Sequence, residues 1–398
     1  MLNKWFKKEK PFLSGTSTTG GAGGFATGSA LPALWNMQKN SVYSFTNLSQ
    51  TGADGPAEAT INAYASGKDY IGFFDAPHRG VQRLVIPTTG NYRIRALGAA
   101  GGSGGSYTGG KGVDITVEGV LIRGQKILMV VGQQGSAGGH GCGGGGGTFV
   151  YFENANGWDN YVMTDIIVAA GGGAGANASH GNGSDALTTI LGGYGDPSIG
   201  SSAASTGWTR PAPGYAGLYE LFNGNGRNYG GGVGAGFFSR RTTLNNISNN
   251  GGSYTFFQDT GGGFNTGSSG SVITTNNSNV SGCAFPGNSG KSGEYSSQSS
   301  FGNSGGANGF VGAWVGGRGA NSSGGNGGFG GGGGGANNCG GSGSGGGFSG
   351  GHGAGCNGVA GGGGTYGRTS ADGFAGWSVT SSAVSSSTSH GSIQITLL

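Results

Sequence analysis

Proline, cysteine, charge and long apolar runs are all scarce in this sequence, and each scarcity excludes a class of protein. Only 9 of the 398 residues are proline and the 101 glycines do not recur at every third position, which excludes a collagen triple helix. Four cysteines in a chain of this length do not form a disulfide framework. No run of about 18 apolar residues occurs, so insertion into a membrane is not expected.

Charged residues make up only 9% of the chain, and three of the four net positive charges lie in the first ten residues, MLNKWFKKEK. A groove that follows phosphates needs clustered Lys and Arg, and the rest of the chain has no such cluster. We therefore expect no nucleic-acid partner. The basic start is followed by PFLSGTSTTGGAGGF, which lacks the apolar segment of a signal peptide and predicts synthesis in the cytoplasm without one.

Apolar residues are nevertheless abundant enough to form a core, at 34% of the chain with 20 Phe, 14 Tyr and 6 Trp. Short apolar or alternating runs predict strands at 81–86, 91–97, 113–118, 126–131, 148–152, 165–170 and 392–398. Alternation in two of these runs predicts the core-facing residues Tyr92, Ile94, Ala96, Val113, Ile115 and Val117. Helical periodicity is almost absent, with AEATINAYASG as the best short candidate. An all-β fold is predicted.

Tracts of three to six glycines separate these strands, without a fixed period, at 143–147, 171–173, 230–232, 261–263, 330–335, 345–347 and 361–364. A lone glycine strand should not hold its shape, because glycine loses the most backbone entropy on ordering. Polyglycine can instead form an extended helix of three residues per turn, whose N–H and C=O groups point outward. Packed side by side, such helices would bond to one another, so we predict an ordered polyglycine II helix bundle.

Composition divides the chain into four predicted parts. Residues 1–40 form an extended N-terminal attachment arm, and 41–173 supply strands of a β-sandwich with the first glycine tracts. Residues 174–375 form the polyglycine bundle with aromatic and polar loops, and 376–398 complete the sandwich.

Several segments occur in a familiar order, among them GPAEATINAY, GVQRLVIPTTGNYRIRALGAAGGSGG, DIIVAAGGGAGA and HGSIQITLL. Together they resemble the glycine-rich extracellular domain of the anaplastic lymphoma kinase and leukocyte tyrosine kinase receptors. The resemblance spans roughly 43–398 and includes the anchors Pro87, Tyr92 and Gln133–Gln134. It implies a jelly-roll, TNF-like β-sandwich joined to a polyglycine-helix bundle, and a role as a binding scaffold.

The sequence also departs from those receptors, because it contains no kinase, no membrane span and not their cysteine pattern. The same domain resembles one found in phage and other viral structural proteins, and KKEKPFLSGTSTTGGAGGFATG resembles the N-termini of small virion proteins from marine phages. This second resemblance implies a virion protein that is made in a host cytoplasm.

The segment from about 174 to 325 is rich in aromatic rings among Gly, Ser and Asn, including Tyr194, Phe237 and Trp314. As loops at the ends of a bundle, such rings suit sugar faces or protein surfaces. The alternative, which we favour for more than half of them, is that they pack on the flanks of the bundle. The residues predicted to bind a host glycan or protein receptor are Trp208, Arg210, Tyr215, Tyr219 and Tyr229.

Trp5 and Phe6 stand among lysines that include Lys7 and Lys8. This arm is interpreted as a docking peptide for other virion proteins, with aromatic anchors and lysines at the rim. The alternative is a frayed terminus.

Two short motifs, HGC and HGAGC, place His140 near Cys142 and His352 near Cys356. Four such ligands could hold zinc tetrahedrally. The alternatives are that these are small buried residues at bundle ends, or that two of the cysteines pair. The spacing differs from the usual zinc-finger patterns, so no cofactor is expected.

Apparent catalytic motifs such as GFSGG arise by chance in a Gly/Ser tract and lack the strand-to-helix context that the chemistry needs. We therefore predict a non-enzymatic virion structural protein, a phage tail fibre or adhesin that displays receptor-binding loops. The alternatives are a cell-surface ligand-binding domain and a structural filament subunit. TNF-like sandwiches and phage fibres often trimerise, so a trimer is one expectation, although no coiled-coil seam is present.

Overall fold

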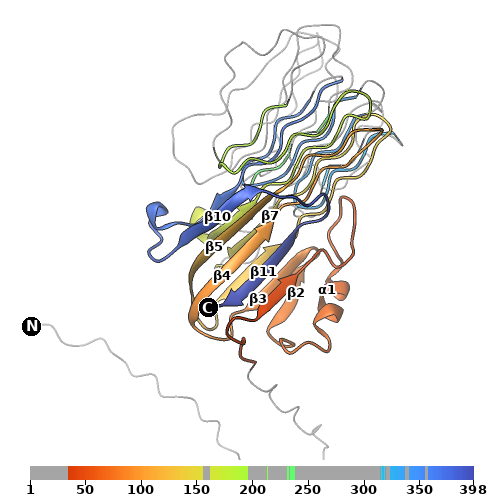
Figure 1. Ribbon diagram of the computed structural model, residues 1–398. Coiled ribbons are helices and arrows are strands. Elements are labelled where there is room, and N and C mark those ends of the chain that lie inside the picture. The colour runs from red at the N-terminus through yellow and green to blue at the C-terminus, as the bar shows by residue number, and fades with distance from the viewer. Residues whose placement is uncertain are drawn as a thin grey trace, which may run out of the picture. The chain divides into compact units, whose positions relative to one another are not determined.

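The computed structural model describes residues 35–155, 162–195, 213, 231–232, 234–237, 314, 316–317, 319, 323–336, 340–354 and 357–398. The chain divides into two compact units, Met1–Leu34 and Trp35–Leu398, and all of the described residues belong to the second. They form two antiparallel β-sheets joined to a region of glycine tracts (Figure 1).

The first sheet has five strands in the order β1-β11-β4-β5-β10. Their bounds are Val42–Phe45, Ser392–Leu397, Gly90–Leu97, Val113–Leu121 and Ser378–Val384. The strands at its centre alternate apolar and polar residues along the chain, which predicts one buried and one exposed face. β4 shows that pattern, because Tyr92, Ile94 and Ala96 are buried whereas Arg93 and Arg95 are exposed.

The second sheet has six strands in the order β2-β3-β6-β7-β8-β9. Their bounds are Phe74–His78, Val81–Val85, Lys126–Val130, Thr148–Phe152, Ile166–Ala170 and Tyr366–Gly367. The one α-helix of the described residues, α1 (Glu58–Ala65), lies in the segment that the sequence favoured for a helix. Two short 3-10 helices, Met163–Asp165 and Ser370–Asp372, complete the described elements.

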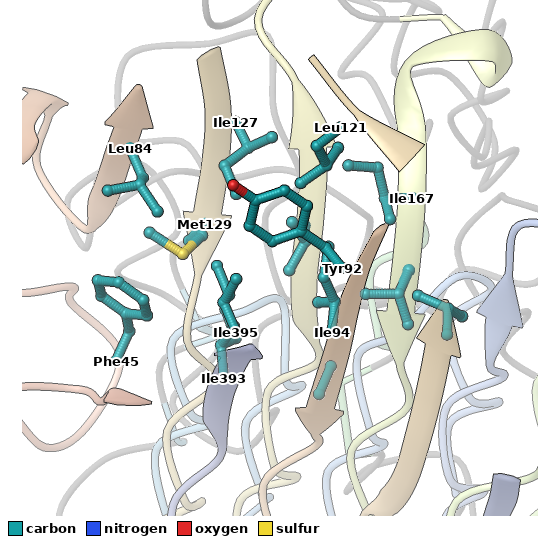
Figure 2. Packing of buried hydrophobic residues seen from close by; sticks show 14 of the residues in the cluster. Phe45, Leu84, Tyr92, Ile94, Leu121, Ile127, Met129, Ile167, Ile393 and Ile395 are labelled. Atoms are coloured by element: carbon teal, nitrogen blue, oxygen red, sulfur yellow. The ribbon is translucent and has the colours of Figure 1, made fainter. Parts of the chain in front are cut away.

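The two sheets pack face to face as a β-sandwich, which confirms the predicted all-β fold. Tyr92, Ile94 and Ile395 from the first sheet meet Ile127 and Met129 from the second in one continuous apolar core (Figure 2). All five of these side chains are fully removed from solvent. Each such burial stabilises the fold by about 1.5–3 kcal/mol relative to exposure, so this layer is held by its side chains.

The second sheet is also buried on its other face. Phe149 and Tyr151 of β7 point away from the first core and pack against Phe237, Trp314 and Phe329. The ring centroids of Phe149 and Trp314 lie 4.2 Å apart, and those of Phe149 and Phe237 lie 5.7 Å apart. Aromatic rings from the glycine-rich part of the chain therefore cover this sheet and form a second core.

The glycine region consists of the described residues of 98–112, 132–147, 171–195 and 231–364. Its segments run side by side beyond the strand ends (Figure 1). The amides of Gly144, Gly145 and Gly146 donate to carbonyl oxygens in three different segments, at Gly333 (2.8 Å), Gly173 (2.7 Å) and Gln133 (3.0 Å). Consecutive residues of one tract thus bond in three directions.

These partners recur every three residues. The amide of Gly147 donates to Gly330 (2.9 Å), three residues before Gly333, and that of Gly141 donates to Ala336 (3.1 Å), three residues after it. The same step relates the donors Cys142 and Gly145, whose acceptors Ala176 and Gly173 also lie three residues apart. A three-residue period of hydrogen-bonded partners therefore organises the tracts.

Neighbouring tracts lie too close together to admit side chains. A Cβ atom added at Gly144 would overlap the carbonyl oxygen of Ser344, and one added at Gly173 would overlap that of Gly110. Glycine is required at such positions because the backbone of the next segment occupies the space of a side chain. Cohesion in this region comes from main-chain hydrogen bonds, each worth about 0.5–1.5 kcal/mol net.

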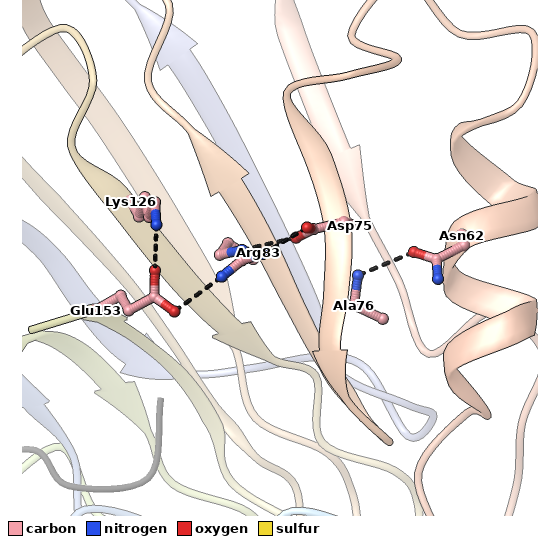
Figure 3. A network of polar contacts seen from close by, with 6 residues as sticks. All are labelled: Asn62, Asp75, Ala76, Arg83, Lys126 and Glu153. Carbon is pink, nitrogen blue, oxygen red and sulfur yellow. Dashed lines mark hydrogen bonds and ion pairs between the residues drawn. The ribbon is translucent and has the colours of Figure 1, made fainter. Parts of the chain in front are cut away.

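A chain of polar contacts crosses the second sheet at the edge near α1 (Figure 3). The Arg83 guanidinium on β3 forms ion pairs with Asp75 of β2 (2.5 Å) and with Glu153 after β7 (2.9 Å). Lys126 of β6 pairs with the other oxygen of Glu153 at 3.2 Å. The hydrogen bonds that Arg83 donates to Asp75 raise the pKa of Arg83, so the guanidinium keeps its charge and ties β2 and β3 to the segment after β7.

Candidate functional site

The described residues on either side of 196–230 are hydrogen-bonded into the glycine region. Before it, Gly193 accepts a hydrogen bond from the amide of His352 (3.0 Å), and after it the amide of Gly231 donates to Ala354 (2.9 Å). The chain therefore departs and comes back against the same short segment, 352–354.

We call this end of the glycine region, around Gly193, Gly231 and 352–354, the distal end. Small polar side chains reinforce it. The Asn177 amide nitrogen donates to Gly340 at 2.9 Å, and the Ser344 hydroxyl donates to the carbonyl oxygen of His352 at 2.7 Å. Both side chains are buried. Because the tracts leave no room for larger groups, short side chains that hydrogen-bond the main chain are the ones that fit.

Tyr194 is the exposed aromatic residue of the distal end among the described residues. Its side chain is 44% exposed, and its ring lies against that of His352 with the centroids 4.7 Å apart. His352 is buried, so it supports one face of the tyrosine ring, and the tyrosine stays partly exposed. A supported, partly exposed tyrosine directly before 196–230 has the character of a binding-surface residue.

All five predicted receptor-binding residues fall between these two anchors, within 196–230. Trp208, Arg210, Tyr215, Tyr219 and Tyr229 lie outside the described residues, so their role stays a prediction.

Two other aromatic residues of the same region have a packing role. Phe237 and Trp314 are fully buried in the second core, with ring centroids 5.7 Å apart. These two rings pack on the second sheet, so they stabilise the fold as side chains of a core.

The predicted metal ligands are placed only in part. Cys142 is a buried free thiol whose Sγ lies 3.7 Å from the carbonyl oxygen of Gly138, and burial raises its pKa. A raised pKa disfavours the thiolate that binds zinc. His140 is half-buried, and Cys356 lies outside the described residues. Within the described part of the chain no three His, Cys, Asp or Glu side chains gather as a metal site would require. The complete four-ligand set stays a prediction.

The predicted docking arm, with Trp5, Phe6, Lys7 and Lys8, also lies outside the described residues. Within the described ranges, no helix has the length and apolar character needed to span a membrane. Sequence reasoning missed Asn177 and Ser344 as organisers of the distal end. Each of them is a hydrogen-bonding residue that stands alone inside or beside a glycine tract, and this pattern could have identified them.

Comparison with known proteins gives a partial match to a receptor. No family model matches the chain. Over 95 residues the chain is 33% identical to the leukocyte tyrosine kinase receptor of Mus musculus, a stretch that covers 23% of this chain and 11% of the receptor. The match therefore spans a small part of the receptor's length and supports a distant relationship.

Proposed function

We propose that the glycine region is a bundle of polyglycine II helices. The supporting observation is the three-residue period of hydrogen-bonded partners along 141–147. An extended helix with three residues per turn turns every third amide toward the same neighbour and bonds none of its amides internally. Such a bundle has few charges and few flexible side chains, which suits a stiff frame exposed outside a cell.

We further propose that this frame serves a non-enzymatic, virion-associated protein, a tail fibre or adhesin. The observation that carries the proposal is the anchoring of both ends of 196–230 against 352–354. A loop whose ends are fixed on a rigid support pays less ordering entropy on binding than a free segment. Loops on rigid scaffolds are also where binding residues concentrate. The proposed target is a glycan or protein on the host surface.

Alanine substitution tests the loop. Trp208, Arg210, Tyr215, Tyr219 and Tyr229 are each replaced in the full chain, and adsorption of particles to host cells is measured. At least two of the five variants should lower adsorption about tenfold or more, as the loss of a binding hot spot does. The matched controls are Ile71→Ala and Val120→Ala, at exposed apolar positions outside the glycine region. Unchanged adsorption in all five loop variants would contradict the proposal.

The virion assignment rests on the N-terminal resemblance, with Trp5 and Phe6 as anchors and Lys7 and Lys8 at the rim of the contact. Mass spectrometry of purified particles should detect the chain at a fixed copy number. Deletion of residues 1–15 should remove it from particles while the remaining chain stays folded. Absence of the full chain from wild-type particles would overturn the virion assignment but would not affect the proposal of a binding scaffold.

A second candidate is a cell-surface ligand-binding domain. The partial match to the leukocyte tyrosine kinase receptor favours it. A folded chain that binds a secreted protein ligand through the same loop, and that is absent from particles, would select this function. Assembly of the purified protein into fibres would instead favour a structural filament subunit.

A further inference from the structure

Within the described residues the two sheets have four edge strands, and three of them are short or protected. β9 has two residues and β1 has four. β2 contains Pro77 and breaks its register between Asp75 and His78. Asn62 of α1 covers this edge and accepts a hydrogen bond from the amide of Ala76 at 3.0 Å (Figure 3). Short length, proline, irregular register and a covering helix are the usual ways to prevent an edge from pairing with another chain.

The fourth edge, β10, has none of these protections except one irregularity at Thr380. It runs for seven residues, SVTSSAV, which include no charge and no proline. Every one of them is exposed. Beyond its pairing with β5, no other described strand pairs with it. An uncharged, exposed edge of this length is a template for pairing with another strand.

Hydrogen bonding to β5 determines which groups of β10 remain free. The amide of Ser385 donates to the carbonyl oxygen of Gly112, directly before β5 (2.8 Å). Val113 lies opposite Val384, but its carbonyl oxygen accepts a hydrogen bond from the amide of Gly98, directly after β4. Residues along an antiparallel strand bond alternately to one side and the other. The N–H and C=O groups of Ser382 and Val384 therefore point away from β5, toward the open edge.

We propose that β10 pairs with β10 of a second copy of this chain, antiparallel about a two-fold axis through Ala383. In that register Ser382 of each copy faces Val384 of the other, and their free backbone groups form four hydrogen bonds. The faces also agree, because Ser382 and Val384 lie opposite Ile115 and Val113, which both face the core. The irregularity at Thr380 lies outside the paired segment.

Charge favours a second copy as the occupant of this edge. A two-fold axis brings each side chain near its own equivalent, so a charged residue close to the axis would repel itself. β10 has no charged residue, and the two acidic residues opposite it on β5 are already neutralised. Asp114 pairs with Arg95, and Glu118 pairs with Arg93 at 2.7 Å. This inference does not depend on what residues 196–230 bind.

Sedimentation of the full chain tests the proposal. The wild-type protein should show a concentration-dependent mass that rises from 38.8 kDa to twice that value. Ala383→Lys places two lysines opposite each other at the axis and should weaken dimerisation by about tenfold or more. The matched control is Ser378→Lys, on the same strand and face but five residues from the axis, which should change the affinity little.

A mixture of Ala383→Lys and Ala383→Glu should recover the dimer, because opposite charges then meet at the axis. Circular dichroism of each variant checks that the sandwich is folded. The proposal is overturned if the wild-type protein stays monomeric up to about 100 μM, if it forms trimers, or if the mixture fails to recover the dimer. Pairing of the edge with an unrelated peptide and not with itself would also overturn it.

Discussion

The β-sandwich and the glycine region of the same chain are held together in opposite ways. In the sandwich, Tyr92 and Ile94 bury large side chains, and the backbone bonds between strands follow from that burial. In the glycine region, Gly144 contributes no side chain, and its amide and carbonyl groups bond directly to neighbouring segments. The first region needs bulk at its core positions, whereas the second needs its absence. Added side-chain bulk should therefore be most costly in the glycine tracts, and lost side-chain bulk should be most costly in the cores.

The largest effect is expected where a side chain is added to a packed tract. Gly144→Ala should lower the free energy of unfolding by more than about 4 kcal/mol or prevent folding, because the new methyl group overlaps the Ser344 carbonyl oxygen. Denaturant unfolding followed by circular dichroism measures it. The control is Gly139→Ala, whose Cβ would meet its nearest neighbour at 3.8 Å and should cost less than about 0.5 kcal/mol. Equal costs at the two positions would contradict close packing of the tracts.

The next effect concerns the aromatic anchors that join the two regions. Phe329 is 1% exposed and its ring lies over Gly55 and Gly80. Phe329→Ala should cost about 3–5 kcal/mol, as the loss of a buried phenylalanine does. Tyr194→Ala, at a partly exposed ring, should cost about 1 kcal/mol. If the two substitutions cost the same, the second core does not hold the glycine region to the sheet.

A smaller effect comes from pH. Burial raises the pKa of Tyr92 to about 12, and its hydroxyl donates to the Thr88 carbonyl oxygen at 2.6 Å. Above pH 10 the unfolded chain loses this proton while the folded chain keeps it, so stability falls between pH 10 and about 12. Tyr92→Phe removes the titrating group. Over this pH range the free energy of unfolding of the variant should fall less steeply than that of the wild-type protein. The difference between the two slopes corresponds to at most about one bound proton. An unchanged slope would show that Tyr92 does not contribute to the loss of stability at high pH.

The smallest effect is expected at the polar network of the second sheet. Asp75 is half exposed, so Asp75→Asn should cost at most about 1 kcal/mol despite the short distance to Arg83. The difference from the wild-type protein should shrink in about 1 M salt, which screens exposed ion pairs. Chemical unfolding at low and high salt measures it. A cost that persists undiminished in high salt would show that packing, and not charge, is lost.

Much of the sandwich could be predicted from the sequence because its strands alternate. The runs at 91–97 and 113–118 indicated both the strands and their buried faces, and Tyr92 and Val117 lie where the pattern placed them. β10 carried no such signal, because both of its faces are exposed and SVTSSAV does not alternate. β2 was missed since Pro77 argues against a strand.

The sequence indicates that the glycine region is ordered, but it does not indicate which glycine tracts lie beside each other. Identical glycines carry no information about which tract lies beside which, so the bond from Gly144 to Gly333 could not be inferred. The anchors Phe329 and Phe348 stand alone among glycines, and nothing local shows that they reach β7 and its neighbours. The five predicted receptor-binding residues lie within 196–230 and outside the described residues, so only the anchors on either side of them belong to the described structure.

Hydrogen exchange at the amides of Gly143–Gly147 tests the central claim most directly, because these amides have no side chains to protect them and depend on backbone bonds alone. Their amides should exchange at least about a thousandfold more slowly than in a free peptide, at rates similar to those of β4 in the sandwich core. Exchange at free-peptide rates, with β4 still protected, would contradict the account.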